Sequence, residues 1–463
     1  MPGTKKFAVI GLDCAAPELV FDQWRDELPC LRSLAAQGLW GKLRSVSPPI
    51  TVPAWSCMMS GKDPGQLGIY GFRNRKDYSY NGMTIANAAA VREPRVWDLL
   101  SQAGKKVIVL FVPGTYPPSP VNGAMVGCFL TPGAQSAYAY PAELKAEIEA
   151  TFGPYRMDVE NFRSEDKDRI LRGIYEMTEQ HFAIARHLLS RIQWDFFMMV
   201  EMGTDRIHHA FWKFHDKTHR LYQPGNRYEN AIRDYYRFVD GKIAELLPAL
   251  GDETSLFVVS DHGAKKMEGG VCVNEWLRQE GYLALQQALD GPTPISKARV
   301  DWGRTSAWGE GGYYSRIFMN VKGREPQGII EPSAYEAVRD ELKAKIEAMV
   351  DDKGMPLGNR VFKPQEIYRA VRGVAPDLIV YFGNLSWRSV GTLGLGSVYT
   401  FENDTGPDDA NHAENGIFLL REQNGKLGRE LQGKQLFDIS ATILDRFGLP
   451  QPSGAQGQAM ERS

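Results

Sequence analysis

The sequence is poor in cysteine. Its 463 residues include only five, at positions 14, 30, 57, 128 and 272. The number is odd, the spacing is wide, and no Cys-x-x-Cys pair occurs, so the sequence indicates neither a disulfide framework nor a zinc ribbon. We therefore expect a protein of a reducing compartment.

Long hydrophobic runs are also missing. No segment approaches the roughly 18 consecutive apolar residues that a membrane span needs. The amino-terminal MPGTKK leads directly into FAVIGLD, without the apolar region of a signal peptide. These absences predict a cytoplasmic location and no membrane span.

The charge shows no excess of either sign. Lysine and arginine total 54 against 56 aspartate and glutamate, which gives a formal net charge of −2, so we expect no nucleic acid polymer as a partner. With 43% hydrophobic residues, the composition is that of a globular chain with a substantial core. The length allows two or three average domains, or one large catalytic domain with insertions.

Short apolar runs alternate with longer helical patterns, which favours an α/β fold. Each run is apolar nearly throughout, as expected for strands buried on both faces of a parallel sheet. The expected strands are residues 7–12, 107–112, 195–200, 256–259 and 378–381. The expected helices are residues 141–150, 166–191, 226–250, 334–350 and 438–447. We predict a doubly wound, mostly parallel sheet with helices on both faces.

Two segments rich in glycine, proline and tyrosine interrupt this alternation. Residues 114–141 and 285–331 have the composition of cap or substrate-facing loops. We therefore predict one catalytic domain over residues 1–463 with cap insertions at these two places. The polar tail, residues 451–463, is expected to be loosely held.

Polar residues follow several of the expected strands. In open α/β sheets functional groups collect at the carboxyl ends of the strands. Carboxylates mixed with imidazoles suit zinc or manganese, and two such ions need about six or seven ligands. The candidates are Asp13, Asp205, His208, His209, Asp261, His262 and the more distant His412.

Spacing orders some of these candidates. Asp205 and His209 are four residues apart, so on a helix they share one face and can bind the same ion. His208 is an alternative to His209, and either histidine could instead be an ordinary buried or surface residue. Asp261 directly follows a buried strand, where an ionised carboxylate must be paired or bound to a metal.

Thr51 is the candidate nucleophile. Pro53 suits the first turn of a helix, which would place Thr51 at a helix amino end, where free N–H groups favour a phosphoryl group. The simpler alternative is that Thr51 only caps the helix.

Several motifs together resemble the alkaline phosphatase superfamily. The match is to its type I phosphodiesterase and nucleotide pyrophosphatase branch, in particular to cytoplasmic bacterial and archaeal members. The similar stretches are AVIGLD (8–13), PPITVPAW (48–55), SGKDPGQLGI (60–69), DRIHH (205–209), SDHG (260–263), NHAENGIF (411–418) and DISATIL (438–444). They occur in the family's order and cover most of the chain.

The resemblance implies roles for individual residues. Thr51 would be the nucleophile and would form a phosphothreonine intermediate that water then cleaves. One metal would be held by Asp205, His209 and His412, and the second by Asp13, Asp261, His262 and the Thr51 oxygen. Zinc is the expected metal, with manganese as the alternative. Asn74 would bind a nonbridging oxygen of the substrate.

Departures from related families narrow the activity. Sulfatases carry Cys or Ser within Cys/Ser-x-Pro-x-Arg, whereas this chain has Thr51-Val-Pro-Ala-Trp55, so sulfatase activity is not expected. Alkaline phosphatases proper use serine, so Thr51 favours the diesterase branch. Exported phosphodiesterases usually have glycine directly before the histidine of the Asp-x-x-x-His segment. This chain has His208 at that position, directly before His209.

These observations leave three hypotheses. The first is a two-metal hydrolase that cleaves a phosphodiester or pyrophosphate bond of a small phosphorylated metabolite. The second is a phosphomutase or phosphomonoesterase with the same metal site. The third is an inactive relative that only binds a phosphorylated ligand, which the full set of ligand types disfavours. A homodimer is the default expectation for the oligomeric state.

Overall fold

A large, mostly parallel sheet forms the centre of the protein. The computed structural model describes residues 6–422 and 427–462. The strand order is β20-β2-β19-β9-β1-β8-β5-β6-β7, with β21 beside β2. The strands are β1 (Phe7–Leu12), β2 (Leu39–Arg44), β5 (Val107–Leu110), β6 (Gly123–Val126), β7 (Ala139–Tyr140), β8 (Phe196–Glu201), β9 (Ser255–Val259), β19 (Asn415–Arg421), β20 (Arg429–Glu430) and β21 (Lys434–Gln435). The strands β9, β1, β8, β5 and β6 are parallel, and β19 runs antiparallel between β9 and β2.

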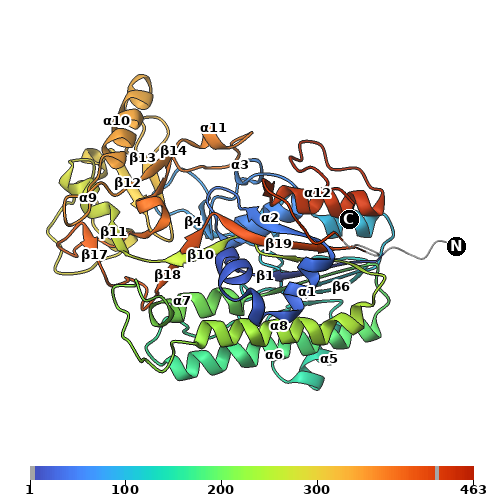
Figure 1. Ribbon diagram of the computed structural model, residues 1–463. Coiled ribbons are helices and arrows are strands. Elements are labelled where there is room, and N and C mark those ends of the chain that lie inside the picture. Colours follow the sequence, from blue (N-terminus) through green and yellow to red (C-terminus); the bar gives the residue numbers. More distant parts are fainter. Residues whose placement is uncertain (1–5, 423–426, 463) are drawn as a thin grey trace.

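Helices cover both faces of this sheet, as Figure 1 shows. One face carries α1 (Pro29–Gln37), α5 (Glu143–Phe152), α6 (Lys167–Arg191), α7 (Gly203–His215) and α8 (Ala231–Leu250). The other carries α2 (Thr51–Ser60), α4 (Val96–Gln102) and α12 (Phe437–Phe447). The predicted doubly wound α/β fold is therefore confirmed.

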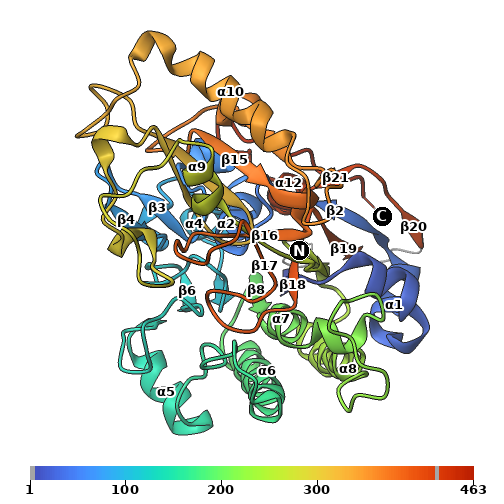
Figure 2. The same ribbon diagram turned by 90° about the vertical axis from the view of Figure 1, so that its left-hand side faces the viewer.

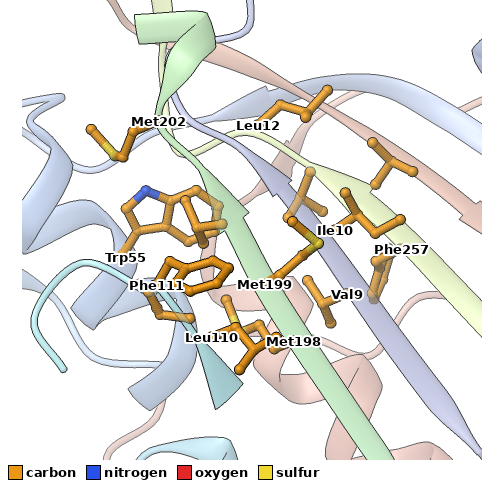
Figure 3. Close-up of a cluster of buried hydrophobic side chains, with 14 of the residues drawn as sticks. Val9, Ile10, Leu12, Trp55, Leu110, Phe111, Met198, Met199, Met202 and Phe257 are labelled. Atoms are coloured by element: carbon orange, nitrogen blue, oxygen red, sulfur yellow. The ribbon is translucent and has the colours of Figure 1, made fainter. Parts of the chain in front are cut away.

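The core lies where the central strands meet α2. Every side chain of β1 and β8 is buried, because strands covered by helices on both faces have no solvent side. Trp55 of α2 packs beside Phe111 and Met202 above these strands (Figure 3). This packing fixes α2 over the carboxyl end of β1.

Gly11 allows this close approach of α2 to β1. A Cβ at Gly11 would overlap the Trp55 ring and lie 2.8 Å from Cγ2 of Val200. We therefore expect Gly11→Ala to lower the free energy of unfolding by about 1–3 kcal/mol, as overpacking does. Urea unfolding measures the change. Gly241→Ala is the control: it lies within α8, and among the described residues no atom other than its chain neighbours and the nearby α8 backbone comes within 4 Å of its added Cβ. It should stabilise by about 0.5–1 kcal/mol. Equal stabilities for Gly11→Ala and the unchanged protein would contradict this packing account.

A second lobe stands beyond the carboxyl edge of the main sheet, at the left of Figure 1. It contains a three-stranded sheet, β16-β11-β17, and a four-stranded sheet, β12-β13-β15-β14. Its elements are β11 (Gly269–Cys272), α9 (Val273–Gln279), β12 (Ala307–Glu310), β13 (Ser315–Met319), α10 (Tyr335–Glu347), β14 (Arg360–Phe362), α11 (Pro364–Ile367), β15 (Leu378–Tyr381), β16 (Trp387–Val390) and β17 (Tyr399–Thr400). Figure 2 views the molecule from this side. The lobe has its own hydrophobic cluster, which includes Trp276, Leu342 and Val380.

Small elements join the lobe to the main body. A hairpin of β3 (Arg73–Arg75) and β4 (Met83–Ile85) follows α3 (Pro64–Leu67). The strand β10 (Gly263–Lys266) pairs antiparallel with β18 (Ala410–Ala413). This second pairing brings residue 412 back to the main sheet.

Three expectations about the fold are corrected. Leu378–Tyr381 is a strand, but it pairs with β13 and β14 in the second lobe and not with the central sheet. Residues 114–141 are not only an insertion, since they supply β6 and β7 to the sheet edge. The tail is docked: Met460 is 2% exposed, and the Gln456 N–H donates to the Gly61 carbonyl at 2.8 Å. Local patterns do not reveal such long-range pairings.

No helix in the part of the chain that the structure covers combines the length and apolarity needed to cross a membrane. All five cysteines are buried free thiols, in agreement with the absence of paired cysteines in the sequence.

Candidate active site

Three central strands deliver carboxylates to one edge of the sheet. Asp13 follows β1, Asp205 lies in the first turn of α7 just after β8, and Asp261 follows β9. The parallel register sets Leu12 beside Glu201, so the three strands end at the same level. All three carboxylates are at most 2% exposed.

The first cluster contains Asp205, His209 and His412. The His209 Nε2 atom lies 3.1 Å from Oδ1 of Asp205 and 3.2 Å from Nε2 of His412. The His412 Nε2 atom is 3.7 Å from the same Asp205 oxygen. The helix supplies the first two residues one turn apart, as their spacing predicts, and the β10–β18 pairing supplies the third.

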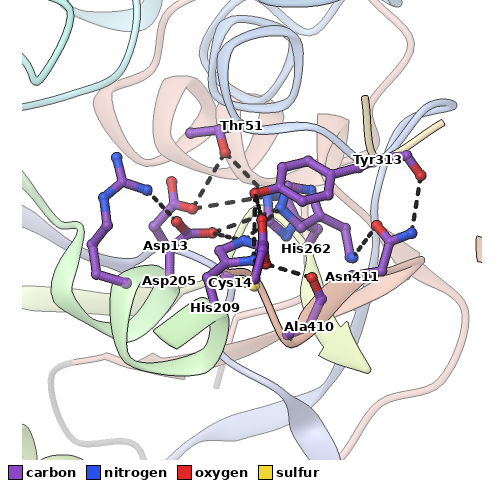
Figure 4. Close-up of polar contacts among 12 residues, drawn as sticks. Asp13, Cys14, Thr51, Asp205, His209, His262, Tyr313, Ala410 and Asn411 are labelled. Atoms are coloured by element: carbon purple, nitrogen blue, oxygen red, sulfur yellow. Dashed lines mark hydrogen bonds and ion pairs between the residues drawn. The ribbon is translucent and has the colours of Figure 1, made fainter. Parts of the chain in front are cut away.

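The second cluster contains Asp13, Asp261 and His262, and Figure 4 shows Asp13 and His262 next to Thr51. The His262 Nε2 atom lies 3.1 Å from Oδ2 of Asp261 and 3.8 Å from Oδ1 of Asp13. The Thr51 Oγ1 atom is 3.3 Å from Nε2 of His262 and 3.5 Å from Oδ1 of Asp13. The seven residues expected to form a two-metal site thus lie together.

Thr51 is held at the start of α2. It is the first residue of that helix and is 2% exposed. One turn later, Trp55 donates its indole N–H to Oδ2 of Asp13 at 2.6 Å. This bond ties the helix to the carboxylate and leaves Oδ1 of Asp13 turned toward Thr51.

All three imidazole rings point Nε2 into the site, because Nδ1 of each ring contacts an acceptor outside it. Nδ1 of His412 lies 2.9 Å from the Pro49 carbonyl, and Nδ1 of His262 lies 3.2 Å from the Gly263 carbonyl. Nδ1 of His209 lies 2.7 Å from Asp408 Oδ1. Because these partners are acceptors, each Nδ1 carries the proton, and Nε2 is free as a metal ligand.

Lone pairs therefore face each other inside the site. Oδ2 of Asp261 is buried and, among residues 6–422 and 427–462, has no hydrogen-bond partner. The nearby Nε2 of His262 is an acceptor as well. Acceptors in buried contact repel unless a cation lies between them, so these residues fit divalent metal ions.

The pKa directions agree with a need for cations. Burial raises the pKa of Asp13 and of Asp261, and nearby carboxylates raise both further. Burial lowers the pKa of His262 to about 4, so this ring is neutral. Burial opposes protonation of His209 too, but Asp408 and Asp205 outweigh it and raise the pKa of His209 to about 9. The two carboxylates thus favour a positive charge at the His209 ring, which a metal ion on Nε2 would supply in place of a proton.

Arg206 fixes the orientation of Asp205. Its Nη1 donates to Oδ2 of Asp205, while Nε and Nη2 donate to the two oxygens of Asp158 at 2.7 and 2.8 Å. Burial opposes the Asp205 charge, but His209 and Arg206 hold the pKa of this carboxyl well below its usual range. Asp205 is therefore ionised and presents Oδ1 to the cluster.

A cavity of about 680 Å³ opens onto these clusters, between the main sheet edge and the second lobe. Thr51, Asp205 and His412 form part of its wall. The remaining wall is mixed, with aromatic side chains and several arginines. Its size is that of a small-molecule site.

Some candidates lie away from the clusters. Asn74 uses its amide within a turn, where Oδ1 accepts from the Tyr70 N–H at 2.7 Å and Nδ2 donates to the Gly71 carbonyl at 2.9 Å. It is not among the described residues that line the cavity, whereas its neighbour Arg73 is. His208 points elsewhere, with Nε2 3.1 Å from the Tyr236 hydroxyl.

Sequence reasoning missed four residues that support the site: Trp55, Arg206, Tyr313 and Asp408. Trp55 could have been found, because it lies one helical turn after Thr51. Tyr313 lies within the predicted cap segment 285–331, and its ring centroid is 4.8 Å from that of His209, on which it stacks, and 4.2 Å from that of His412. Asp408 lies in an irregular segment, where no periodicity points to it.

Comparisons with known proteins agree with this geometry. Residues 7–408 match the family described as type I phosphodiesterase / nucleotide pyrophosphatase. Murine ectonucleotide pyrophosphatase / phosphodiesterase 5, solved as an inactive variant in complex with AMP, is 12% identical with a TM-score of 0.56, over 98% of this chain and 97% of that chain. Human ectonucleotide pyrophosphatase / phosphodiesterase 5 is 13% identical with a TM-score of 0.55, over 98% of this chain and 97% of that chain. At such identities the likeness shows a shared fold. Curated proteins gave no match.

Proposed function

The chain belongs to the type I phosphodiesterase / nucleotide pyrophosphatase family, and from this premise we propose that it cleaves a phosphodiester or pyrophosphate bond of a small metabolite through a phosphothreonine intermediate. The observation that carries the proposal is the position of Thr51. Its hydroxyl lies at a helix amino end within 3.5 Å of both His262 and Asp13.

Two displacements make up the reaction. In the first, Thr51 Oγ1 gives its proton to solvent and forms a bond to phosphorus, while the bond from phosphorus to the leaving oxygen breaks and the leaving oxygen departs with the bonding electrons. In the second, water forms the new bond and the bond to Thr51 breaks, which restores the hydroxyl. The amino end of α2 favours the phosphoryl charge in both steps.

Two divalent ions would complete this site. Asp205, His209 and His412 would hold one, and Asp13, Asp261 and His262 the other, together with the Thr51 oxygen. Bound there, the ions would supply Lewis-acid charge and lower the pKa of the attacking hydroxyl or water. The mixed oxygen and nitrogen donors suit zinc, with manganese as the alternative.

The cavity favours a diester or pyrophosphate over a monoester. A volume of about 680 Å³ leaves room for a substituent on each side of the phosphorus. The family match ends at residue 408, so the proposed role of His412 rests on the resemblance of residues 411–418 and on its contacts with His209 and Asp205. The cytoplasmic location, the single-domain division and the homodimer remain predictions.

The proposal is tested with bis(p-nitrophenyl) phosphate beside p-nitrophenyl phosphate. The protein is stripped of metal and then supplied again with zinc or manganese. We expect faster release of nitrophenolate from the diester, restored by metal. Preference for the monoester would instead support the phosphatase or mutase alternative, and no turnover of either compound would favour a binding role.

A further inference from the structure

Two arginines lie on the wall of the cavity beyond the Asp205 cluster. The guanidinium carbons of Arg163 and Arg388 lie 6.0 and 5.9 Å from the centre of the Tyr313 ring. The same ring stacks on His209 and contacts His412 in a tilted arrangement. Both arginines line the cavity, and the Tyr313 ring separates them from the histidines of the Asp205 cluster.

Two buried hydrogen-bond donors beside Tyr313 have no acceptor among the described residues. The Arg388 side chain is only 6% exposed, and its Nε has no hydrogen-bond acceptor within the described part of the chain. The neighbouring Ser389 hydroxyl is buried and unpartnered in the same way, and it also lines the cavity. Buried donors without acceptors are rare and costly, so the pair indicates a ligand that brings an acceptor.

Other donors of the two arginines are occupied, since Nη2 of Arg163 donates to the Tyr313 hydroxyl at 2.6 Å and Nη1 of Arg388 to the Thr405 hydroxyl at 3.3 Å. Arg163 Nε donates to Asp408 Oδ2 at 3.1 Å, while Nη1 of Arg388 is 4.0 Å from the same oxygen. Oδ1 of Asp404 lies 3.6 Å from Nη2 of Arg388, beyond hydrogen-bond distance. Two carboxylates thus lie near the two guanidinium groups, but neither accepts a hydrogen bond from Nε of Arg388. Glu310 is a further acidic group on the cavity wall.

The geometry of an in-line displacement places the leaving group of the substrate in this region of the cavity. In an in-line displacement the leaving oxygen departs opposite the nucleophile. Thr51 stands against His262 and Asp13, so the leaving group points across the phosphorus toward the Asp205 cluster and on to Tyr313. Its distal part then meets Arg388.

Resting on the proposed function, we propose that Arg388, Ser389 and Arg163 form a subsite for an anionic substituent, a phosphoryl or carboxylate group, on the leaving group of the substrate. A guanidinium group binds such oxyanions through charge-assisted hydrogen bonds. The substrates are then phosphoric esters or anhydrides whose leaving group carries its own negative charge.

A matched pair of esters tests the subsite: methyl 4-carboxyphenyl phosphate and methyl 4-carbamoylphenyl phosphate. The two have nearly the same shape, and the carbamoyl phenolate is the better leaving group, so chemistry alone favours the amide. We expect the metal-loaded protein to prefer the carboxylate ester about tenfold or more in kcat/KM, mainly through KM.

Variants assign the preference to residues. In Arg388→Gln the carboxylate-to-amide ratio of kcat/KM should fall to one or below, and in Ser389→Ala it should fall by a smaller factor. Arg237→Gln removes an exposed arginine of α8, with a side chain 56% exposed, and should keep the ratio. Because the readout is a ratio, partial loss of folded protein does not affect it.

The outcomes separate this inference from the proposed function. Equal cleavage of the two esters, or preference for the amide, overturns the subsite and leaves the hydrolase assignment intact. A carboxylate preference that persists in Arg388→Gln overturns the assignment to this arginine. Cleavage of neither ester overturns both the proposed function and the subsite that rests on it.

Discussion

Thr51→Ala is expected to lower kcat for a phosphodiester by at least about a thousandfold, because it removes the nucleophile that divides one difficult displacement into two. The loss should appear in kcat, since the cavity and both ligand clusters remain. The measurement is steady-state turnover of bis(p-nitrophenyl) phosphate with saturating metal.

Thr51→Ser is the matched control for this prediction. It keeps a hydroxyl at the first position of α2 and should retain a measurable part of the activity. Metal content and the circular dichroism spectrum show whether each variant is folded. Full activity in Thr51→Ala would mean that water attacks phosphorus directly, and the nucleophile assignment would be wrong.

Removal of metal is the second change with a large expected effect. After chelation we expect turnover to fall by at least about a thousandfold, because without cations the hydroxyl pKa stays high and the developing charge is not stabilised. Zinc or manganese should restore it. Thermal stability should fall with the same treatment, since ions that bind only the folded state stabilise it.

The two clusters can be distinguished by metal analysis. Plasma mass spectrometry should find about two ions per chain in the unchanged protein, as the ligand count requires. His209→Ala should lose the ion of the first cluster, and Asp261→Asn that of the second. Equal metal content in all three proteins, or unchanged turnover after complete chelation, would contradict the two-metal site.

The sequence predicts most of the site because its ligands follow strongly patterned elements. Asp13 comes one residue and Asp261 two residues after the end of a strand with a clear apolar run. Asp205 and His209 are one helical turn apart, and their contact at 3.1 Å is what that spacing predicts. Such local signals are enough to place residues at the carboxyl edge of a parallel sheet.

The contacts that orient these ligands are not predictable in the same way. Asp408 reaches His209 across 199 positions of the chain, from a segment without periodicity. The apolar run of residues 378–381 predicts a buried strand, but it does not indicate which strands will pair with it. The sheet to which this strand belongs is therefore not predictable from the pattern. The resemblance implies that Asn74 binds the substrate, but local hydrogen bonds hold its amide within a turn.

The central claim is a covalent intermediate on Thr51, and the stereochemical course at phosphorus tests it most directly. A phosphorothioate diester of defined configuration is hydrolysed in ¹⁸O-labelled water by the metal-loaded protein, and the configuration of the thiophosphate product is determined. Each in-line displacement inverts phosphorus. Two displacements through Thr51 therefore predict net retention, whereas net inversion would show direct attack by water and contradict the account.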